Sequence, residues 1–180
     1  MFWYLLLILA VGAERLVELF VARRNMAWSL THGGHEVGFA QYPFIVALHL
    51  GLLVGAVAEV WYAGRPFLPW LGWPMLAVVV AAQGLRWWCI RTLGPQWNTR
   101  ILVVPGAARV TSGPYRWLAH PNYVAVVAEG IALPLVHTAW ITAVTFTVLN
   151  GALLTVRIRV EAAALRGLAP ARSTRRAAKD

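Results

Sequence analysis

Apolar residues in this chain run in long blocks and do not alternate with polar ones as they would in a soluble domain. A helix rises about 1.5 Å per residue, so about 20 apolar residues cross a hydrocarbon core of about 30 Å. Measured against that length, the sequence predicts membrane-spanning helices over residues 2–22, 42–62 and 69–90. The first of these is interrupted by three charged side chains, whereas the second contains little that is polar.

A fourth apolar block, from Pro121 to Val156, has one charged residue, Glu129, and is long enough for two crossings. We predict a helical hairpin with spans over 121–136 and 139–156. Its bend is expected near Pro134, which breaks helices and is followed by polar groups suited to a water interface. The fold class expected is therefore an all-α integral membrane protein with five transmembrane helices.

Composition supports this class, because 59% of the residues are hydrophobic and only 13% are charged. A chain this apolar does not stay disordered, and it has too little polar surface to cover a small soluble core. Ten tryptophans are typical of anchoring at membrane interfaces. We expect one membrane domain over residues 1–168 and a short, basic, disordered tail over 169–180.

The basic residues predict an orientation. Segments 22–41 and 91–120 and the chain after residue 156 hold most of them, whereas Arg65 stands alone between the second and third spans. Lys and Arg beside membrane spans stay on the cytoplasmic side, so the N-terminus is expected outside. The net charge of +9 is then explained by topology and by contact with membrane lipids, and neither a nucleic-acid nor a protein partner is predicted.

The segment from Arg91 to His120 is longer than the usual connection in a helical bundle, so we expect it to form a structured cytoplasmic loop. Ile101-Leu-Val-Val, a Pro105-Gly106 turn and Arg109-Val-Thr are typical of two short strands that pair with each other. Ser112-Gly-Pro114 indicates a second turn.

The residues that follow suggest a binding site. Pro121 suits the first position of a helix, which places His120 near the cap. Free backbone N–H groups at a helix start attract anions, and His120 and Tyr123 would add directional hydrogen bonds there. The same two side chains could equally serve as interfacial anchors of the fourth span.

After the fifth span the sequence predicts a cytoplasmic C-terminal helix that carries Arg157 and Glu161 on one face. One interpretation is a surface ion pair worth about 0.3–0.5 kcal/mol. The other is a site for a zwitterionic ligand, in which the carboxylate binds the ligand's cation and the guanidinium binds its carboxylate.

These two segments resemble the isoprenylcysteine carboxyl methyltransferase family and its bacterial relatives. Gly113-Pro-Tyr-Arg-Trp-Leu-Ala-His-Pro-Asn-Tyr123 is similar to the GxYxxxRHPxY signature, and Arg157-Ile-Arg-Val-Glu161 to the terminal RxxxEE segment. The N-terminal half resembles a bacterial branch associated with type III polyketide synthases. That likeness is carried by Glu14-Arg-Leu-Val-Glu18, Arg24-Asn25, Gly33-Gly34, Glu36 and Tyr42-Pro43.

The resemblance implies a methyltransferase that uses S-adenosylmethionine. Its implied acceptor is a lipophilic small molecule that enters from the membrane, either an alkylpyrone or alkylresorcinol hydroxyl or a prenylcysteine carboxylate. No metal is implied. The candidate cofactor-binding residues are Tyr115, His120, Asn122, Tyr123, Arg157 and Glu161.

Two positions depart from the family pattern. Ala119 stands where the family usually has the Arg before the His-Pro pair, and Ala162 where it usually has a second Glu. Loss of the Arg weakens the case for a negatively charged acceptor more than for a phenol or enol. Loss of the second Glu removes one partner for the amino or ribose groups of the cofactor.

Charged residues within the spans are candidate catalytic groups, because charge at that depth is usually functional. Glu14, Glu18, Arg86 and Glu129 are the candidates, since a phenolic acceptor with a pKa of about 10 benefits from a base. The alternative is interhelical salt bridging, with Arg86 pairing with Glu14 or Glu129. Arg15 can pair with Glu18 three residues away.

The rival interpretation is a non-catalytic or haem-binding membrane bundle with His49 as a ligand. Depth argues against haem, because His49 lies about 10 Å inside the second span. His120 and His137 belong at opposite surfaces, so no pair of histidines faces across one plane.

Overall fold

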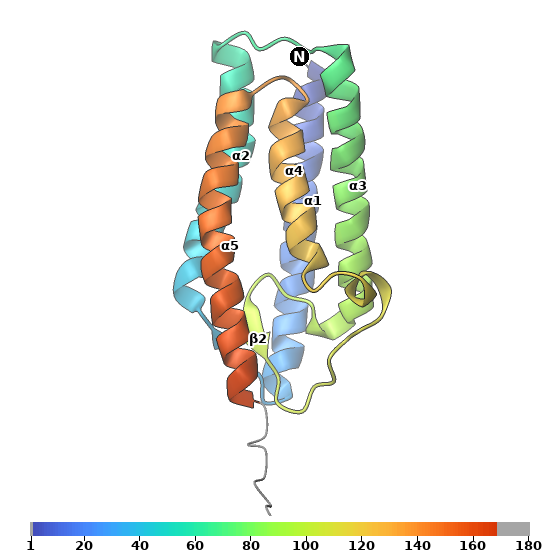
Figure 1. Ribbon diagram of the computed structural model, residues 1–180, viewed down its shortest axis with the longest axis vertical. Coiled ribbons are helices and arrows are strands. Elements are labelled where there is room, and N and C mark those ends of the chain that lie inside the picture. Colours follow the sequence, from blue (N-terminus) through green and yellow to red (C-terminus); the bar gives the residue numbers. More distant parts are fainter. Residues whose placement is uncertain (1, 169–180) are drawn as a thin grey trace, which may run out of the picture.

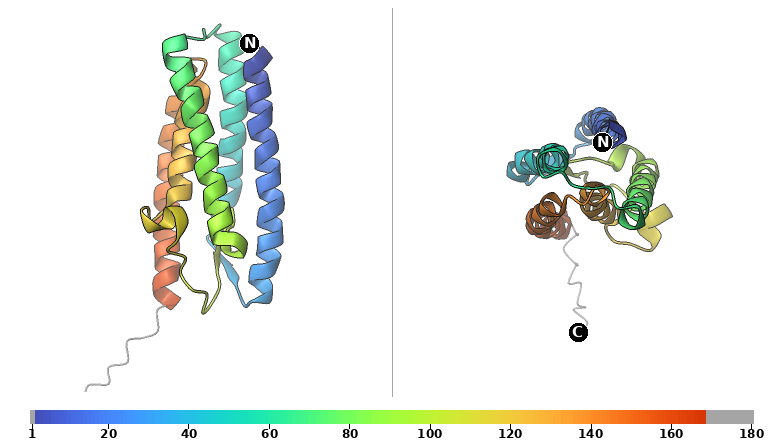
Figure 2. Two further views of the ribbon diagram at one scale, coloured as in Figure 1. Left: turned by 90° about the vertical axis from the view of Figure 1, so that its right-hand side faces the viewer. Right: turned by 90° about the horizontal axis from the view of Figure 1, so that it is seen from above.

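The structure is a computed structural model that describes residues 2–168, with side chains described as far as residue 164. Five antiparallel helices form an elongated bundle (Figures 1 and 2). Their bounds are α1 (Phe2–Thr31), α2 (Tyr42–Tyr62), α3 (Pro69–Leu93), α4 (Pro121–Leu135) and α5 (Trp140–Leu168). The view along the bundle in Figure 2 shows them in the order α1, α2, α5, α4, α3 around the centre. The all-helical bundle predicted from the apolar blocks is thus confirmed.

The shortest helix, α4, packs against both α3 and α5 and is the most buried of the five. Small residues make this possible, because Ala125 and Ala132 are almost fully buried at close contacts. A Cβ on Gly130 would overlap the ring of Phe146 on α5, so only glycine lets the two helices approach this closely. Helix α4 is therefore packed closely between α3 and α5, and its side chains join those of α1, α2 and α3 in the hydrophobic core.

Helix α1 is fastened at both ends. Near its start, the Tyr4 hydroxyl donates to the backbone carbonyl of Leu133 at 3.0 Å. Near its end, the Asn25 side chain donates to the carbonyls of Gly94 and Trp97 at 3.0 and 2.8 Å. The Asn98 side chain in turn donates to an α1 carbonyl at 2.9 Å.

Within residues 2–168, three segments are long and apolar enough to cross a membrane, namely Phe39–Tyr62, Pro69–Gln96 and Trp140–Ala164. Helix α4 is apolar but has 15 residues, about 22 Å. Helix α1 is long enough, with 30 residues, but carries several charges. Large apolar side chains cover the outside of the bundle, which suits contact with lipid. The structure thus fits an integral membrane protein, and the count of five crossings stays a prediction.

Two helices extend beyond the predicted spans. Helix α1 continues nine residues past Ala22, and α5 runs without a break through Val156 to Leu168, so the predicted terminal helix is part of the fifth span's helix. Neither Pro nor Gly occurs between residues 21 and 31 or between 156 and 166. Hydrophobic length marks where a helix leaves lipid, whereas helix ends depend on such breakers. The predicted tail, 169–180, lies outside the described residues.

The predicted bend of the hairpin is confirmed, because α4 ends at Leu135 and α5 begins at Trp140. Pro134 lies within the last turn of α4. The turn itself is formed around Thr138, which adopts a positive φ of 53° and donates its hydroxyl to the Pro66 carbonyl at 2.9 Å.

The predicted pair of strands within the 91–120 connection is wrong. Only β2 (Ile101–Val103) forms, and it pairs antiparallel with β1 (His35–Val37), while residues 109–111 have no regular structure. Side chains explain the choice of partner, since the Arg100 guanidinium donates twice to the Glu36 carboxylate, at 2.9 and 3.1 Å. It also lies over the Tyr42 ring, 4.1 Å from the centroid.

Both the β1–β2 pair and the last described turns of α5 lie at one end of the bundle (Figure 1). The start of α1 lies at the other end, with the α2–α3 and α4–α5 connections. The basic segments 22–41 and 91–120 therefore share one end, as predicted. Which side of a membrane this end faces stays a prediction.

Candidate functional site

The start of α4 is placed as predicted, with Pro121 in the first turn and His120 as the cap residue. The His120 side chain makes no capping hydrogen bond. It stacks on the Tyr123 ring, with the ring centroids 5.1 Å apart and the planes 12° from parallel. The pair stands at the end of the bundle that carries the long connection.

Tyr123 joins the two segments that suggested a site in the sequence. Its hydroxyl donates to Glu161 Oε2 at 2.7 Å and accepts from Arg157 Nε at 3.0 Å. His120 Nδ1 lies 4.0 Å from the same Glu161 oxygen. We call these four residues the Tyr123 site.

A third segment closes the Tyr123 site. Arg157 donates through Nη2 to the Thr99 carbonyl at 2.8 Å, which ties the long connection to α5. The structure therefore brings together the start of α4, the end of α5 and the loop. Arg157 and Glu161 meet through the Tyr123 hydroxyl, which neither the ion-pair nor the ligand interpretation anticipated.

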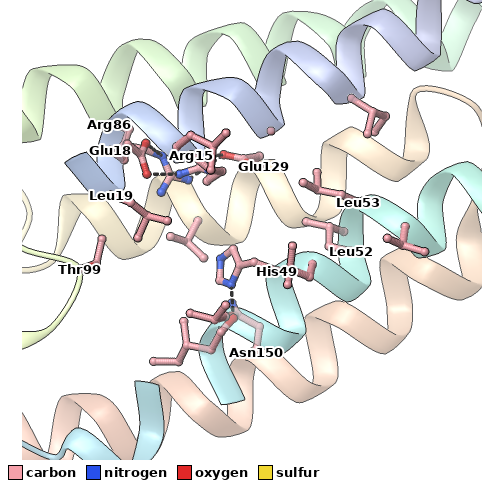
Figure 3. A pocket seen from close by; sticks show the side chains of 18 of the residues that line it. Arg15, Glu18, Leu19, His49, Leu52, Leu53, Arg86, Thr99, Glu129 and Asn150 are labelled. Atoms are coloured by element: carbon pink, nitrogen blue, oxygen red, sulfur yellow. Dashed lines mark hydrogen bonds and ion pairs between the residues drawn. The ribbon is translucent and has the colours of Figure 1, made fainter. Parts of the chain in front are cut away.

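A cavity of about 990 Å³ extends from the Tyr123 site into the bundle (Figure 3). Helices α1 and α2 form most of its wall, with α4 and α5 opposite. Tyr123 and Arg157 line one end and Leu5 and Tyr62 the other. Its lining is largely apolar and it has room for an extended, lipid-like molecule.

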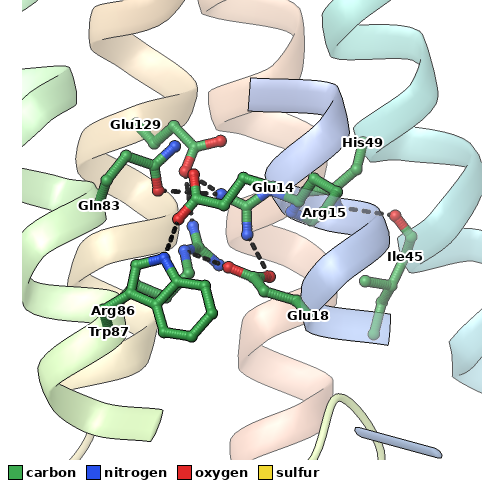
Figure 4. Close-up of polar contacts among 9 residues, drawn as sticks. All are labelled: Glu14, Arg15, Glu18, Ile45, His49, Gln83, Arg86, Trp87 and Glu129. Atoms are coloured by element: carbon green, nitrogen blue, oxygen red, sulfur yellow. Dashed lines mark hydrogen bonds and ion pairs between the residues drawn. The ribbon is translucent and has the colours of Figure 1, made fainter. Parts of the chain in front are cut away.

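Four charged side chains form a cluster on the cavity wall, drawn in Figure 4: Arg15, Glu18, Arg86 and Glu129. Arg86 Nη2 donates to Glu129 Oε2 at 2.7 Å, and its Nε lies 3.3 Å from Glu18 Oε1. Arg15 bridges the same two carboxylates from α1. Both carboxylate side chains are about 95% buried or more. Two guanidiniums and two carboxylates give this charged cluster no net charge.

The predicted pairs Arg15–Glu18 and Arg86–Glu129 are thereby confirmed as contacts. The alternative pair of Arg86 with Glu14 does not form, because the Glu14 carboxylate accepts a hydrogen bond from the Trp87 indole N–H. These ion pairs offset the free energy that is lost when the four charges are removed from water. A catalytic role for Glu14, Glu18, Arg86 or Glu129 remains a prediction.

The end of the cavity that is lined by Tyr123 and Arg157 has polar groups that suit an amino-acid ligand. In the described part of the chain, Asn122 Oδ1 and the Trp97 indole N–H are buried without a hydrogen-bond partner, and both residues line the cavity. Arg157 donates to two uncharged oxygens, so its charge is available to a carboxylate. Together these hydrogen-bond donors and acceptors fit the carboxylate, ammonium and hydroxyl groups that S-adenosylmethionine carries.

Three predicted cofactor residues do not line the cavity: His120 and Glu161 belong to the Tyr123 site beside its end, whereas Tyr115 lies apart from both. Tyr115, in the short 3-10 turn Gly113–Arg116, is not among the residues that line the cavity. Burial raises the pKa of Tyr115 well above its usual value. This position suits packing of the turn against α3.

Sequence reasoning missed several residues that line the cavity. His49 on α2 projects into it opposite the charged cluster (Figure 3), and Trp97, Thr99 and Asn150 also contribute. No motif marks these residues, because the helices and loop that carry them meet only in the folded chain. The sequence alone presents His49 only as a candidate haem ligand.

Comparison with known proteins agrees with this geometry. A sequence profile of the isoprenylcysteine carboxyl methyltransferase (ICMT) family matches residues 75–167, which include α4, most of α5 and all of the Tyr123 site. The chain belongs to this family. It is also 42% identical over 166 residues to the uncharacterized protein YpbQ of Bacillus subtilis (strain 168), covering 92% of this chain and 96% of that protein.

No solved structure gives a significant match to the chain. Members of the ICMT family are methyltransferases that use S-adenosylmethionine. Family membership and the apolar helices together support a methyltransferase of the membrane.

Proposed function

We propose that this protein is an S-adenosylmethionine-dependent O-methyltransferase whose acceptor is a lipophilic molecule that enters from the membrane. The observation that carries the proposal is one continuous cavity of about 990 Å³ that is lined at one end by Tyr123 and Arg157 and extends between α1 and α2. One end suits a polar donor and the other a lipid tail, as a transfer between those two molecules requires.

The Tyr123 site and its neighbours hold the donor. Arg157 binds its carboxylate, Glu161 its ammonium group or ribose hydroxyls, and Asn122 and His120 add hydrogen bonds. When bound, the donor supplies an electrophilic methyl group. The tie between Arg157 and the Thr99 carbonyl keeps the loop over this end and positions the guanidinium.

The acceptor lies along the cavity with its oxygen toward the Tyr123 site. Candidates are an alkylpyrone or alkylresorcinol hydroxyl and a prenylcysteine carboxylate. Ala119 favours the hydroxyl, because the cation that the family usually places there is lacking. The guanidiniums of the charged cluster are neutralised by Glu18 and Glu129, so among the described lining residues only Arg157, which this proposal gives to the methyl donor, is left as a cation for a carboxylate.

Positioning supplies most of the catalysis in this proposal. Methyl transfer is an in-line displacement, and alignment of the reacting atoms about 3–3.5 Å apart lowers the barrier whether or not an acid or base group also takes part. Arg157 and Tyr123 fix one reactant, and the apolar walls orient the other. The Tyr123 site faces the cytoplasm and the N-terminus lies outside.

Titration of the purified protein in detergent with S-adenosylhomocysteine tests the donor site. We expect saturable binding that Glu161→Gln and His120→Ala abolish while the far-UV circular dichroism stays helical. His32→Ala is the matched control, because His32 is exposed and outside the cavity. Wild-type affinity in Glu161→Gln would refute the assignment.

Methyl transfer from radiolabelled S-adenosylmethionine to a long-chain alkylresorcinol, an alkylpyrone and a prenylcysteine identifies the acceptor class. Absence of any saturable binding of S-adenosylhomocysteine would instead favour a non-catalytic bundle. A Soret band in the purified protein would favour haem binding.

A further inference from the structure

We propose that His49 is the general base of this enzyme and takes the proton of a hydroxyl acceptor as the methyl group is transferred. The inference rests on the proposed function and adds to it a residue and a reaction step. It also commits the acceptor to a hydroxyl, since a carboxylate is already ionised at neutral pH and needs no base.

The hydrogen bonding of His49 fixes which nitrogen is free. Nδ1 lies 2.8 Å from the carbonyl oxygen of Ile45, one turn earlier on α2. A carbonyl oxygen only accepts, so Nδ1 must carry hydrogen and the lone pair of the neutral ring is on Nε2. In the part of the chain that the structure describes, Nε2 makes no hydrogen bond, and the residue lines the cavity.

Packing fixes the direction of the ring. The His49 imidazole meets the Phe146 ring edge to face, with the centroids 5.4 Å apart and the planes at 88°. Phe146 is itself buried against Gly130. Figure 3 shows the imidazole projecting into the cavity between α1 and α5. A base held on a rigid helix in this way is positioned before the acceptor arrives.

The carboxylates near His49 are engaged in ion pairs, whereas its Nε2 lone pair is free to accept a proton. Arg15 on α1, Arg86 on α3 and Glu129 on α4 act on it electrostatically, whereas α5 contributes the uncharged Asn150 and Phe146. Glu129 accepts from both guanidiniums, and Glu18 is paired with the same two. A carboxylate so engaged is a weaker proton acceptor than a free imidazole lone pair.

The step conserves atoms and charge. The acceptor O–H bond breaks, and its proton moves to His49 Nε2. The oxygen lone pair forms the new bond to the methyl carbon as the sulfur–carbon bond breaks, and that bonding pair stays on sulfur. The products are a methyl ether, S-adenosylhomocysteine and an imidazolium ion, which returns its proton to water after release.

His49→Gln in the full-length protein tests this step. With a long-chain alkylresorcinol as acceptor, we expect kcat to fall by about 10²–10⁴. Affinity for S-adenosylhomocysteine should stay within about twofold, which shows that the donor site is intact. His32→Gln, at an exposed histidine outside the cavity, is the matched control and should retain wild-type kcat.

Two measurements separate a base from a merely structural histidine. A nitro-substituted alkylresorcinol, ionised at the assay pH, needs no base, so His49→Gln should methylate it nearly as fast as the wild type does. In His49→Ala, added imidazole should restore part of the rate toward the ordinary alkylresorcinol, because the truncation leaves space for it.

A second test needs no cofactor. The ionisation of a long-chain nitrophenol bound in the cavity is measured from its visible absorbance as a function of pH. In the wild type, His49 takes the phenol proton on Nε2, and the resulting imidazolium stabilises the phenolate beside it. The pH midpoint of the bound probe should therefore lie about one unit higher in His49→Gln. His32→Gln should leave that midpoint unchanged.

Equal losses of kcat toward the ordinary and the nitro-substituted acceptor would overturn the proposal, as would an unchanged midpoint for the bound probe. So would a wild-type enzyme that methylates only the prenylcysteine carboxylate. That last outcome leaves the proposed methyltransferase intact, whereas absent S-adenosylhomocysteine binding removes both proposals. Activity within twofold of the wild type in His49→Gln would also refute the role of the base.

Discussion

At the scale of single residues, one hydroxyl connects the parts of the candidate site. The Tyr123 hydroxyl donates to the Glu161 carboxylate and accepts from the Arg157 guanidinium. It therefore orients two opposite charges that are both carried by α5. Such a hydroxyl contributes through geometry, because both partners retain their charges without it. Its removal should loosen the ligand site more than it destabilises the fold.

We predict that Tyr123→Phe weakens binding of S-adenosylhomocysteine about tenfold, which corresponds to the roughly 1.4 kcal/mol typical of a lost hydrogen bond to charged groups. Calorimetric titration in detergent measures this. Tyr62→Phe is the control, since Tyr62 is 87% exposed at the far end of the cavity. Equal affinities in Tyr123→Phe and the wild type would show that the hydroxyl does not organise the site.

The charged cluster contributes to stability through the balance of its buried charges. Removing one partner of a buried pair leaves an uncompensated charge in a region of low polarity. Glu129, with 3% of its side chain exposed, contacts both Arg15 and Arg86. We predict that Glu129→Gln lowers the free energy of unfolding by about 3–5 kcal/mol.

Reversible unfolding in mixed detergent micelles measures that loss. Glu14→Gln is the matched control, because Glu14 accepts one hydrogen bond from Trp87 and forms no ion pair with either guanidinium of the charged cluster in the described structure. We expect Glu14→Gln to cost about 1 kcal/mol. Equal losses in the two variants would mean that the charged cluster does not depend on charge balance.

At the scale of elements, the approach of α4 to α5 depends on the absence of a side chain at Gly130, where a Cβ would overlap Phe146. We predict that Gly130→Ala lowers the free energy of unfolding by about 1–3 kcal/mol, as overpacked cores do. Thermal unfolding in detergent is the measurement. Gly151→Ala, with open space around its added methyl group, should be neutral or stabilising by up to about 1 kcal/mol.

A combined variant checks the cause. Phe146→Leu vacates part of the space that the new methyl group needs, so it should recover some of the stability lost in Gly130→Ala. Additive losses in the double variant would place the cost in the backbone of α4 and not in the contact with Phe146.

The elements also show what the sequence can and cannot predict. Prolines at the ends of apolar runs located the starts of α3 at Pro69 and α4 at Pro121 and the bend after Pro134. These features could be predicted because the length needed to cross lipid and the geometry of proline are local constraints. The strand at Ile101–Val103 was recognised but given the wrong partner. Strand pairing depends on distant contacts, here the pair of Arg100 with Glu36.

The candidate site divides in the same way. Motifs led to Tyr123, Arg157 and Glu161, but spacing could not show that all three share one hydroxyl. His49 has no motif at all, since its relevance comes from the fold that turns α2 toward the charged cluster. Local pattern thus located the donor end, and only the assembled helices revealed the wall of the cavity.

At the scale of the whole molecule, the arrangement makes a prediction about sidedness. The long connection, which leads into the start of α4, lies toward one end of the bundle, and the α2–α3 connection lies at the other (Figure 1). Basic residues concentrate at the first end, so we predict that it faces the cytoplasm.

Cysteine labelling with a membrane-impermeant maleimide checks this orientation. Ala107→Cys, in an exposed part of the long connection, should react in inside-out vesicles and not in intact cells, and Ala63→Cys should show the reverse. The native Cys89 is fully buried and should stay silent in both. The opposite pattern would place the donor site outside the cell, away from cytoplasmic S-adenosylmethionine. Labelling of both positions from one side would mean that α3 does not separate the two ends across a membrane.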